Sequence, residues 1–326
     1  QPSSEPMLVM NGNQALGLGI MASGMEVVAM YPITPATSVS HYLARAFSDV
    51  GGILHQAEDE IAATGFPIGA SWAGKTACTI TSGPGLALKT EFLGYAVMAE
   101  IPLVVINVQR GGPSTGLPTK SEQADLFQAC FSAHGDVVRP VLAPTSVADT
   151  FAITVEAFNV AEHYQTPVIL LSDQEIAQRK ETVDPIDTKA FTIVERRRPT
   201  AADLEKYERF KATDSGISPI SHPGMPGGNY LASGIEHNER GAPTASGEVH
   251  ARMNDKRIRK LDPLTRRRDL FLVEGDSHAP VALVSWGSVA GAAREALELA
   301  RREGIQAKLL VPKLVVPVAD EIYADF

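Results

Sequence analysis

The segment from Thr76 to Met98 constrains the fold of this chain more than any other. An apolar run, Thr76 to Ile80, leads directly into a turn of small residues, Thr81-Ser82-Gly83-Pro84-Gly85, and a helical pattern then continues from Leu86 to Met98. A strand that passes through a glycine turn into a helix brings bare backbone N–H groups up to a ligand. The segment therefore predicts an α/β fold with a ligand site where this strand ends.

The same alternation of strand and helix patterns extends from Gly12 to about Pro185. Strands are predicted at 26–30, 75–80, 103–108, 137–142 and 168–171, and helices at 14–23, 37–47, 59–72 and after the capping signal at 145–149. The continuous β-branched runs among these strands are typical of strands buried on both faces. The pattern predicts an open, mostly parallel α/β sheet.

At 326 residues, the chain is long enough for about two domains. We expect a first domain over 1–187, an excursion over 188–278 that either packs on the domains or forms a disordered linker, and a second α/β domain over 279–326. The second domain is predicted from a strand at 280–286, a helix at 287–302 and a strand at 308–311. It stops too soon to close a sheet, so we expect it to be truncated, and the first residue, Gln1, suggests a processed piece.

Composition excludes several classes of protein. A net charge of -9 argues against nucleic-acid binding, and no apolar run approaches the roughly 20 residues that span a bilayer. No signal peptide is apparent. Cys78 and Cys130 have no C-x-x-C spacing, so we expect no iron–sulfur or structural zinc site on this chain, and reduced thiols in the cytoplasm.

Glu60 is the first candidate for chemistry. Glu58 and Asp59 suit the acidic N-terminus of a helix, whereas Glu60 precedes Ile61 and the small residues to Gly69, a face that we expect to be buried. A carboxyl in such surroundings would be driven toward a strong hydrogen bond with a partner such as a ring nitrogen.

Thr34 is the second candidate, because Pro32 and Pro35 rigidify the backbone on both sides of it. Its hydroxyl would lie at a strand's carboxyl end, where open α/β sheets place ligands. The alternative is an ordinary helix cap, with Thr34 as the N-cap residue and Pro35 following it.

Arg110 is the third candidate, since it follows the buried strand at 103–108 and precedes a Gly-Pro loop. A guanidinium in that position can bind a carboxylate through two parallel hydrogen bonds. The alternative is a structural salt bridge.

Together these motifs resemble a known family. Glu60, Gly69 and the run from Lys75 to Gly85 are similar to the pyrimidine-binding domain of thiamine diphosphate enzymes, and Tyr31-Pro32-Ile33-Thr34-Pro35 is similar to the α-subunit signature of 2-oxoacid:ferredoxin oxidoreductases. The resemblance implies that Glu60 bonds N1′ of the aminopyrimidine and stabilises the imino tautomer that deprotonates the thiazolium C2. It also implies cofactor contacts for Pro32, Ile33, Ser82, Gly83 and Pro84, and contact of Thr34 and Arg110 with the 2-oxoacid.

The loop from Gly111 to Thr119 most resembles the 2-oxoglutarate branch of the family. Ser114, Thr115 and Lys120 would then supply donors for the distal carboxylate of the substrate. For Lys120, the alternative is an ordinary solvated surface lysine.

Two family features are absent from the sequence. No Gly-Asp-Gly motif with a following Asn is present, since Gly275-Asp276 continues as Ser277, and no cluster-binding cysteines occur. The resemblance therefore implies a β subunit that carries the diphosphate half of the site, its Mg²⁺ and a [4Fe–4S] cluster, together with a γ domain or subunit. The second α/β domain would be of the transketolase C-terminal type.

The activity implied is conversion of 2-oxoglutarate, coenzyme A and oxidised ferredoxin to succinyl-CoA, CO₂ and reduced ferredoxin. One alternative is an α subunit that acts on pyruvate or branched 2-oxoacids. An alternative of another class is a non-catalytic α/β interaction subunit.

Overall fold

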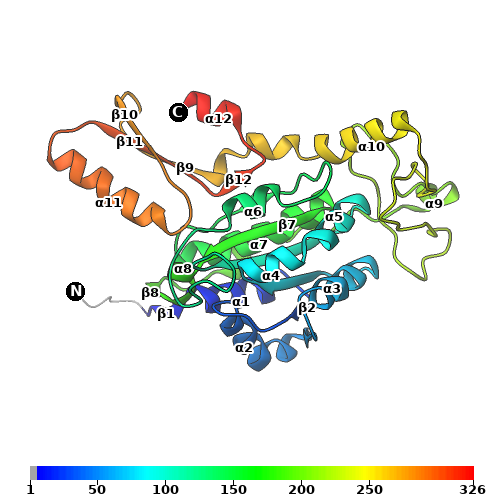
Figure 1. Cartoon of the computed structure of the whole chain (residues 1–326), viewed down its shortest axis with the longest axis horizontal. Helices are drawn as coiled ribbons and strands as arrows, with labels where there is room; N and C mark the ends of the chain where they lie inside the picture. Colours follow the sequence, from blue (N-terminus) through cyan, green and yellow to red (C-terminus); the bar gives the residue numbers. More distant parts are fainter. Residues whose placement is uncertain (1–5) are drawn as a thin grey trace.

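The computed structural model describes residues 6–326 and is built around one seven-stranded sheet (Figure 1). The strand order is β12-β6-β7-β5-β4-β2-β3, and all neighbours run parallel except β12, which is antiparallel to β6. The predicted open, mostly parallel α/β sheet is confirmed.

Strands and helices alternate along the first part of the chain. The strands of the large sheet are β2 (Val27–Met30), β3 (Ile53–Gln56), β4 (Ala77–Thr81), β5 (Leu103–Gln109), β6 (Val141–Leu142), β7 (Pro167–Asp173) and β12 (Leu314–Val316). The helices beside them are α1 (Gly12–Ala22), α2 (Thr37–Ala46), α3 (Ala62–Trp72), α4 (Gly83–Leu88), α5 (Thr90–Met98), α6 (Leu126–Phe131), α7 (Val147–Tyr164) and α8 (Gln174–Gln178). A separate antiparallel pair is formed by β1 (Leu8–Asn11) and β8 (Lys180–Val183).

Strand β5 shows why the sheet is buried on both faces. All of its residues are buried, and successive side chains point to opposite faces. Val104 and Ile106 join the core cluster that includes residues of α1, α2 and α7, whereas Leu103 and Val105 join the one that includes residues of α3, α4, α5 and α6. Two helical layers therefore sandwich the sheet.

Several predicted elements differ from the observed ones. Strand β3 was not predicted, because its edge position leaves its side chains exposed or half-buried. The single helix predicted at 86–98 is two helices, α4 and α5, which meet at Lys89. The helix predicted from Asp59 begins at Ala62, and the strand predicted at 137–142 is limited to β6.

A second, three-stranded sheet lies beside the first one, at the upper left of Figure 1. Its order is β10 (Val281–Val284), β11 (Ala307–Pro312) and β9 (Phe271–Gly275), and α11 (Val289–Arg302) connects the parallel strands β10 and β11. The predicted βαβ unit is present, but the expectation of a buried strand at 280–286 is wrong. Strand β10 is mostly exposed, because it lies at the edge of this small sheet.

The segment between the two sheets packs on the first one. It contains α9 (Ala201–Glu205) and α10 (Gly247–Arg259), and α10 runs along the top of the large sheet in Figure 1. Its first part is attached by Arg196, whose guanidinium forms a buried pair with Glu162 at 2.6 Å. The predicted excursion over 188–278 also contains β9, which pairs in the second sheet. The division into three parts stays a prediction.

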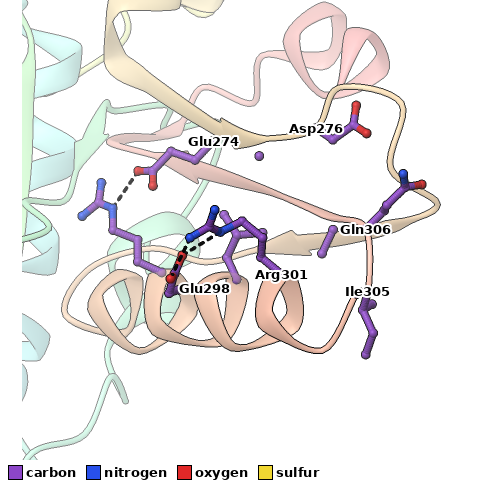
Figure 2. A pocket seen from close by; sticks show the side chains of 11 residues that line it. Glu274, Asp276, Glu298, Arg301, Ile305 and Gln306 are labelled. Carbon is purple, nitrogen blue, oxygen red and sulfur yellow. Dashed lines mark hydrogen bonds and ion pairs between the residues drawn. The ribbon is translucent and has the colours of Figure 1, made fainter.

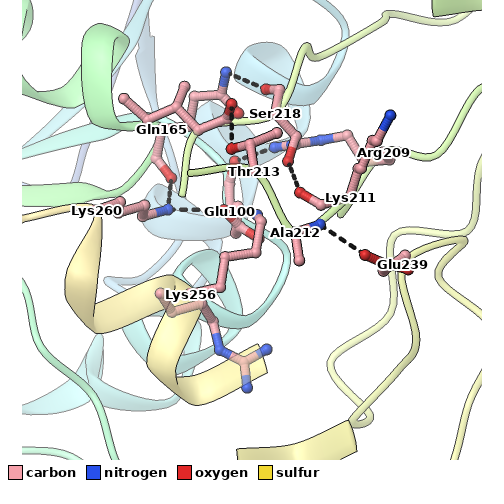
Figure 3. A network of polar contacts seen from close by, with 12 residues as sticks. Glu100, Gln165, Arg209, Lys211, Ala212, Thr213, Ser218, Glu239, Lys256 and Lys260 are labelled. Carbon is pink, nitrogen blue, oxygen red and sulfur yellow. Dashed lines mark hydrogen bonds and ion pairs between the residues drawn. The ribbon is translucent and has the colours of Figure 1, made fainter. Parts of the chain in front are cut away.

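A buried charge cluster holds α10 in place (Figure 3). The carboxylate of Glu100 accepts hydrogen bonds from Lys256 at 2.5 Å and Lys260 at 2.9 Å, and Arg209 donates to the Glu100 carbonyl at 2.6 Å. Burial alone would raise the pKa of the Glu100 carboxyl, but the lysines and Arg209 hold that pKa well below its usual range. The excursion is therefore attached through an ionised carboxylate in the protein interior.

Among residues 6–326, no helix combines the length and the hydropathy that crossing a bilayer requires. Both cysteines are free thiols.

We predict that Glu100→Gln lowers the free energy of unfolding by about 3–5 kcal/mol, because two buried ammonium groups lose their counter-charge. Chemical denaturation at pH 7 measures this loss. Because the folded-state pKa of Glu100 is depressed, its stabilising effect is present above the unfolded pKa of about 4.3 and is lost as the pH falls further. The gap between variant and wild type should therefore narrow in acid.

The control is Glu298→Gln, which removes an exposed partner of Arg301 and Arg302 and should leave the denaturation midpoint unchanged. Equal midpoints for Glu100→Gln and wild type would contradict the role of this cluster.

Candidate active site

Four neighbouring strands deliver the predicted site residues to one edge of the sheet. In the order β5-β4-β2-β3, the parallel strands end at Gln109, Thr81, Met30 and Gln56. The chain then reaches Arg110, Ser82, Thr34 and Glu60 within four residues of these ends. Because carboxyl ends of parallel strands share an edge, residues far apart in the sequence come together there.

Glu60 lies in the turn between β3 and α3 and is half-buried. Its carbonyl accepts hydrogen bonds from Lys89 Nζ at 2.9 Å and Thr64 Oγ1 at 2.8 Å. Its side chain lies against Gly85, since a Cβ placed on that glycine would be 3.0 Å from Glu60 Cγ and 3.3 Å from Oε1. No hydrogen bond from residues 6–326 reaches this carboxylate, which leaves it available to a ligand.

The face that follows Glu60 is not buried as expected. Ile61 is 50% exposed and Gly69 is also exposed. These residues line an open apolar groove of about 930 Å³, together with His55 and Phe66, whose rings stack at 4.4 Å. The expectation failed because the small residues of α3 face this groove instead of another helix.

Thr34 is exposed at the tip of the loop between β2 and α2. The alternative of an N-cap role is wrong, because α2 begins at Thr37 and its N-cap residue, Ala36, has no side-chain hydrogen bond. The loop is instead anchored by Asn13, whose side-chain amide donates to the Pro35 carbonyl at 2.9 Å. Ile33 packs against the core beneath it.

Arg110 is 6% exposed and connects two loops of the site. Its guanidinium donates to the Thr34 carbonyl at 2.6 Å and to the Thr115 carbonyl at 2.9 Å. No carboxylate among the described residues lies within salt-bridge distance of it, so the alternative of a structural salt bridge is wrong. Its Nε is buried and has no hydrogen-bond partner within residues 6–326. Burial lowers the pKa of the guanidinium, an effect that Asp125 opposes.

A cavity of about 430 Å³ brings together only part of the predicted substrate and cofactor residues, and its lining does not include Thr34, Glu60 or Ser82. Its walls include Gly83, Pro84, Arg110 and the loop from Gly111 to Ser114. Ser114 and Thr115 are exposed within this loop, which is closed by a hydrogen bond from Leu117 N–H to the Gly111 carbonyl at 2.8 Å. Lys120 is exposed too, and its carbonyl accepts from Gly111 N–H at 3.1 Å. The cavity does not include Lys120.

Asp125 is a cavity residue that the sequence did not single out. It is 7% exposed, and its carboxylate accepts a hydrogen bond from Asn107 Nδ2 at 2.9 Å. Burial raises the pKa of the Asp125 carboxyl and Glu122 adds to the rise, whereas Asn107 and Arg110 oppose it. Asn107 offered the one available signal, as a polar residue within the otherwise apolar start of β5.

The buried lysine that supports Glu60 was also missed. Lys89 is fully buried, although its position within a helical pattern gave no sign of that. Its three hydrogen bonds go to Glu60, Thr64 and Thr79, at 2.9, 3.0 and 3.1 Å.

A second cavity, of about 440 Å³, lies between α11 and the β9–β11 pair (Figure 2). Four of its charged residues form ion pairs, Arg294 with Glu274 at 2.6 Å and Arg301 with Glu298 at 2.9 Å, whereas Asp276 accepts a hydrogen bond from the His278 N–H. The predicted site residues all lie elsewhere. Within residues 6–326, no group of three or more His, Cys, Asp or Glu side chains is placed to hold a metal ion.

Comparison with known proteins identifies the family of this chain. The family model described as pyruvate flavodoxin/ferredoxin oxidoreductase, thiamine diphosphate-binding, matches residues 18–256. The 2-oxoglutarate synthase subunit KorA of Methanothermobacter thermautotrophicus is 37% identical over 308 residues, which are 92% of this chain and 79% of the relative. The 2-oxoglutarate oxidoreductase subunit KorA of Mycobacterium tuberculosis is 40% identical over 306 residues, 90% of this chain and 46% of that one.

Solved structures show the same similarity. The 2-oxoglutarate:ferredoxin oxidoreductase from Magnetococcus marinus, with 2-oxoglutarate, coenzyme A and succinyl-CoA bound, matches with a TM-score of 0.97 and 44% identity. The match covers all of this chain, which spans 57% of the chain in that structure. A split-gene transketolase, 15% identical with a TM-score of 0.54 over 97% of this chain and 75% of its own, shares the fold alone.

The family predicted from the motifs around Thr34, Glu60 and Ser82 is confirmed, as is its closeness to the 2-oxoglutarate branch. This chain belongs to the pyruvate flavodoxin/ferredoxin oxidoreductase family, and it contains that family's thiamine diphosphate-binding domain.

Proposed function

We propose that this chain is the α subunit of a 2-oxoglutarate:ferredoxin oxidoreductase, which converts 2-oxoglutarate and coenzyme A to succinyl-CoA and CO₂ while reducing ferredoxin. The observation that carries the proposal is the meeting of Glu60, Thr34 and Arg110 at one sheet edge, beside a cavity. The names of the most similar relatives support the choice of substrate.

The residues at this edge fit the aminopyrimidine end of thiamine diphosphate. Ser82 Oγ is buried, and no group in the described part of the chain forms a hydrogen bond with it. The backbone at Gly83 and Gly85 is in close contact with neighbouring groups, so any side chain there would clash, and Pro84 lines the cavity. Pro32 and Ile33, in the loop after β2, are the further cofactor contacts that we propose. When bound, thiamine diphosphate supplies the electron sink for decarboxylation of a 2-oxoacid.

The other proposed roles belong to the chain's own side chains. Glu60 holds a proton between its carboxyl and a ring nitrogen of the cofactor, for which its side chain is free. Arg110 binds the C1 carboxylate of the 2-oxoacid, and Thr34 orients the substrate beside it. Burial strengthens the attraction of the Arg110 guanidinium for an anion, because little water competes for it.

The distal carboxylate of 2-oxoglutarate would lie by the loop after Arg110. Ser114 and Thr115 are exposed there and offer hydroxyl donors. Lys120, exposed and close in sequence, would add a positive charge. An enzyme that prefers a dicarboxylate needs such donors, since an unpaired charge costs binding energy.

Other chains must complete this site. We propose a β subunit that carries the diphosphate half, Mg²⁺ and a [4Fe–4S] cluster, because this sequence has neither motif. A γ domain or subunit, ferredoxin and coenzyme A are the further partners. With two free thiols and no disulfide among the described residues, we place the complex in the cytoplasm.

The second candidate is an α subunit that acts on pyruvate or on a branched 2-oxoacid. Such a subunit would use the same chemistry, and the loop at 111–119 would bind a different substrate side chain. A non-catalytic interaction subunit is disfavoured by the contact between Arg110 and the Thr34 loop, because two predicted substrate residues would then meet without purpose.

For Glu60→Gln in the complete complex, we predict a fall in kcat of about 10²- to 10⁴-fold, because the proton at the ring nitrogen is no longer controlled. Reduction of a viologen dye with 2-oxoglutarate measures it. Glu58→Gln is the matched control, since Glu58 is exposed and two residues away. Near-normal turnover of Glu60→Gln would remove Glu60 from the mechanism.

For Arg110→Lys, we expect the KM for 2-oxoglutarate to rise about tenfold or more, because an ammonium cannot bind a carboxylate through two parallel N–H groups. Steady-state kinetics with Arg198→Lys as the control test this, as Arg198 lies away from the cavity and bonds Gly74. A KM equal to that of the wild type would contradict substrate binding by Arg110.

Gly85→Ala should weaken thiamine diphosphate binding, since its Cβ would lie 2.2 Å from Thr81 Oγ1 and push the Glu60 side chain aside. Calorimetric titration of the cofactor-stripped complex measures the effect, which we expect to be about tenfold or more. Gly291→Ala in α11 is the control, because its Cβ would meet no atom within 4 Å. Unchanged affinity for Gly85→Ala would show that the cofactor lies elsewhere.

A further inference from the structure

Lys89 is a buried cation at the junction of α4 and α5. Its side chain is fully buried, and its ammonium donates to the Glu60 carbonyl, Thr64 Oγ1 and Thr79 Oγ1. These three oxygens belong to the turn before α3, to α3 itself and to β4. Every N–H of the ammonium is therefore used, and each bond joins a different element around Glu60.

The other fully buried lysines of the chain are different. Lys256 and Lys260 both pair with the carboxylate of Glu100, at 2.5 and 2.9 Å. Lys89 has no carboxylate within 4 Å among residues 6–326; its three hydrogen-bond acceptors are all uncharged oxygens. Burial lowers its pKa to about 8, an effect that the charges of Glu60 and Asp59 oppose.

A buried ammonium without a paired carboxylate costs free energy. Packing alone does not require one, because a methionine side chain would fill similar space without a charge. A role for Lys89 is therefore to be sought in the groups that its ammonium binds. Of these three residues, Glu60 is the one that belongs to the proposed site.

Two residues of one helical turn contact Glu60. Gly85 is the third residue of α4 and Lys89 is its C-cap residue, four positions later, so the two lie on the same side of the helix. Gly85 leaves room for the Glu60 side chain, with its would-be Cβ 3.0 Å from Cγ. Lys89 holds the Glu60 carbonyl at 2.9 Å. Lys89 therefore fixes the backbone of Glu60, and the absence of a side chain at Gly85 leaves space for the Glu60 carboxyl.

We propose that Lys89 is a positioning residue, which fixes the Glu60 peptide so that the Glu60 carboxyl extends across Gly85 toward the cofactor. The inference rests on the proposed function, since it acts through the role given there to Glu60. It adds a residue from outside the cavity to the machinery of the site.

The first test is Lys89→Met in the complete complex, compared with Lys75→Met. Lys75 is exposed and pairs only with Glu26 on the surface, so it is a matched change far from Glu60. Lys89→Met should weaken thiamine diphosphate binding by about 10- to 100-fold in calorimetric titration, as loss of a hydrogen bond from a charged donor does. It should also lower kcat while the KM for 2-oxoglutarate changes less than about twofold, because Arg110 is untouched.

A double-mutant cycle separates positioning from general stability. If Lys89 acts through Glu60, the loss of cofactor affinity caused by Lys89→Met should fall below about twofold in a Glu60→Gln background. An additive loss in that background would overturn the proposal. So would a change in KM as large as the change in kcat.

Thr79→Val keeps the test decisive if Lys89→Met does not fold. It removes one acceptor of Lys89 without contact to Glu60, and we expect about a threefold to tenfold loss of cofactor affinity. Thr154→Val is its control, a buried threonine in α7 whose hydroxyl donates to the Thr150 carbonyl of the same helix. Cofactor affinity of Thr79→Val equal to that of this control would contradict the proposal.

The two hypotheses fail in different ways. If Glu60→Gln itself leaves cofactor affinity and kcat unchanged, the proposed function of Glu60 is wrong. If Glu60→Gln is impaired while Lys89→Met and Thr79→Val are not, the proposed function stands and only the role of Lys89 is wrong.

Discussion

The parallel pairing of β3, β2, β4 and β5 is the constraint on which the site depends. In its register Met30 lies beside both Gln56 and Ile80, and Thr81 lies beside Asn107. Each strand therefore stops at the same edge, and four loops leave it together. Arg110, Ser82, Thr34 and Glu60 are far apart in the sequence and meet only because the strands are in this register. A shift of register in any pair of strands would move their loops apart.

Buried cations hold the loops that follow the strand ends in place. Arg110 holds the Thr34 loop to the loop at Thr115, and Lys89 holds the turn that carries Glu60. Away from the site, Glu100 attaches α10 with two lysines. In the cluster at Glu100 the lysines pair with a carboxylate, whereas Arg110 and Lys89 bind backbone carbonyls and hydroxyls and have no paired carboxylate among the described residues. That difference leaves Arg110 free to attract an anionic substrate.

Much of the fold could be predicted from the sequence, because buried parallel strands such as β5 are continuous apolar runs. Strand β3 was not predicted, since an edge strand need not be apolar. Without β3, the position of the Glu60 turn at the edge of the sheet could not be predicted. The motifs identified Thr34, Glu60 and Arg110, but not their contacts. Asp125 and Lys89 carry no sequence signal of burial, because a charged residue is buried only by elements that meet in three dimensions.

The proposed function requires this edge of the sheet to bind a 2-oxoacid with two carboxylates. The most direct test is the ratio of kcat/KM for 2-oxoglutarate, pyruvate and a branched 2-oxoacid, measured with the complete complex and one electron acceptor. We expect the highest kcat/KM for 2-oxoglutarate, by about tenfold or more, because its second carboxylate would bind donors in the loop after Arg110. A higher kcat/KM for pyruvate would contradict it.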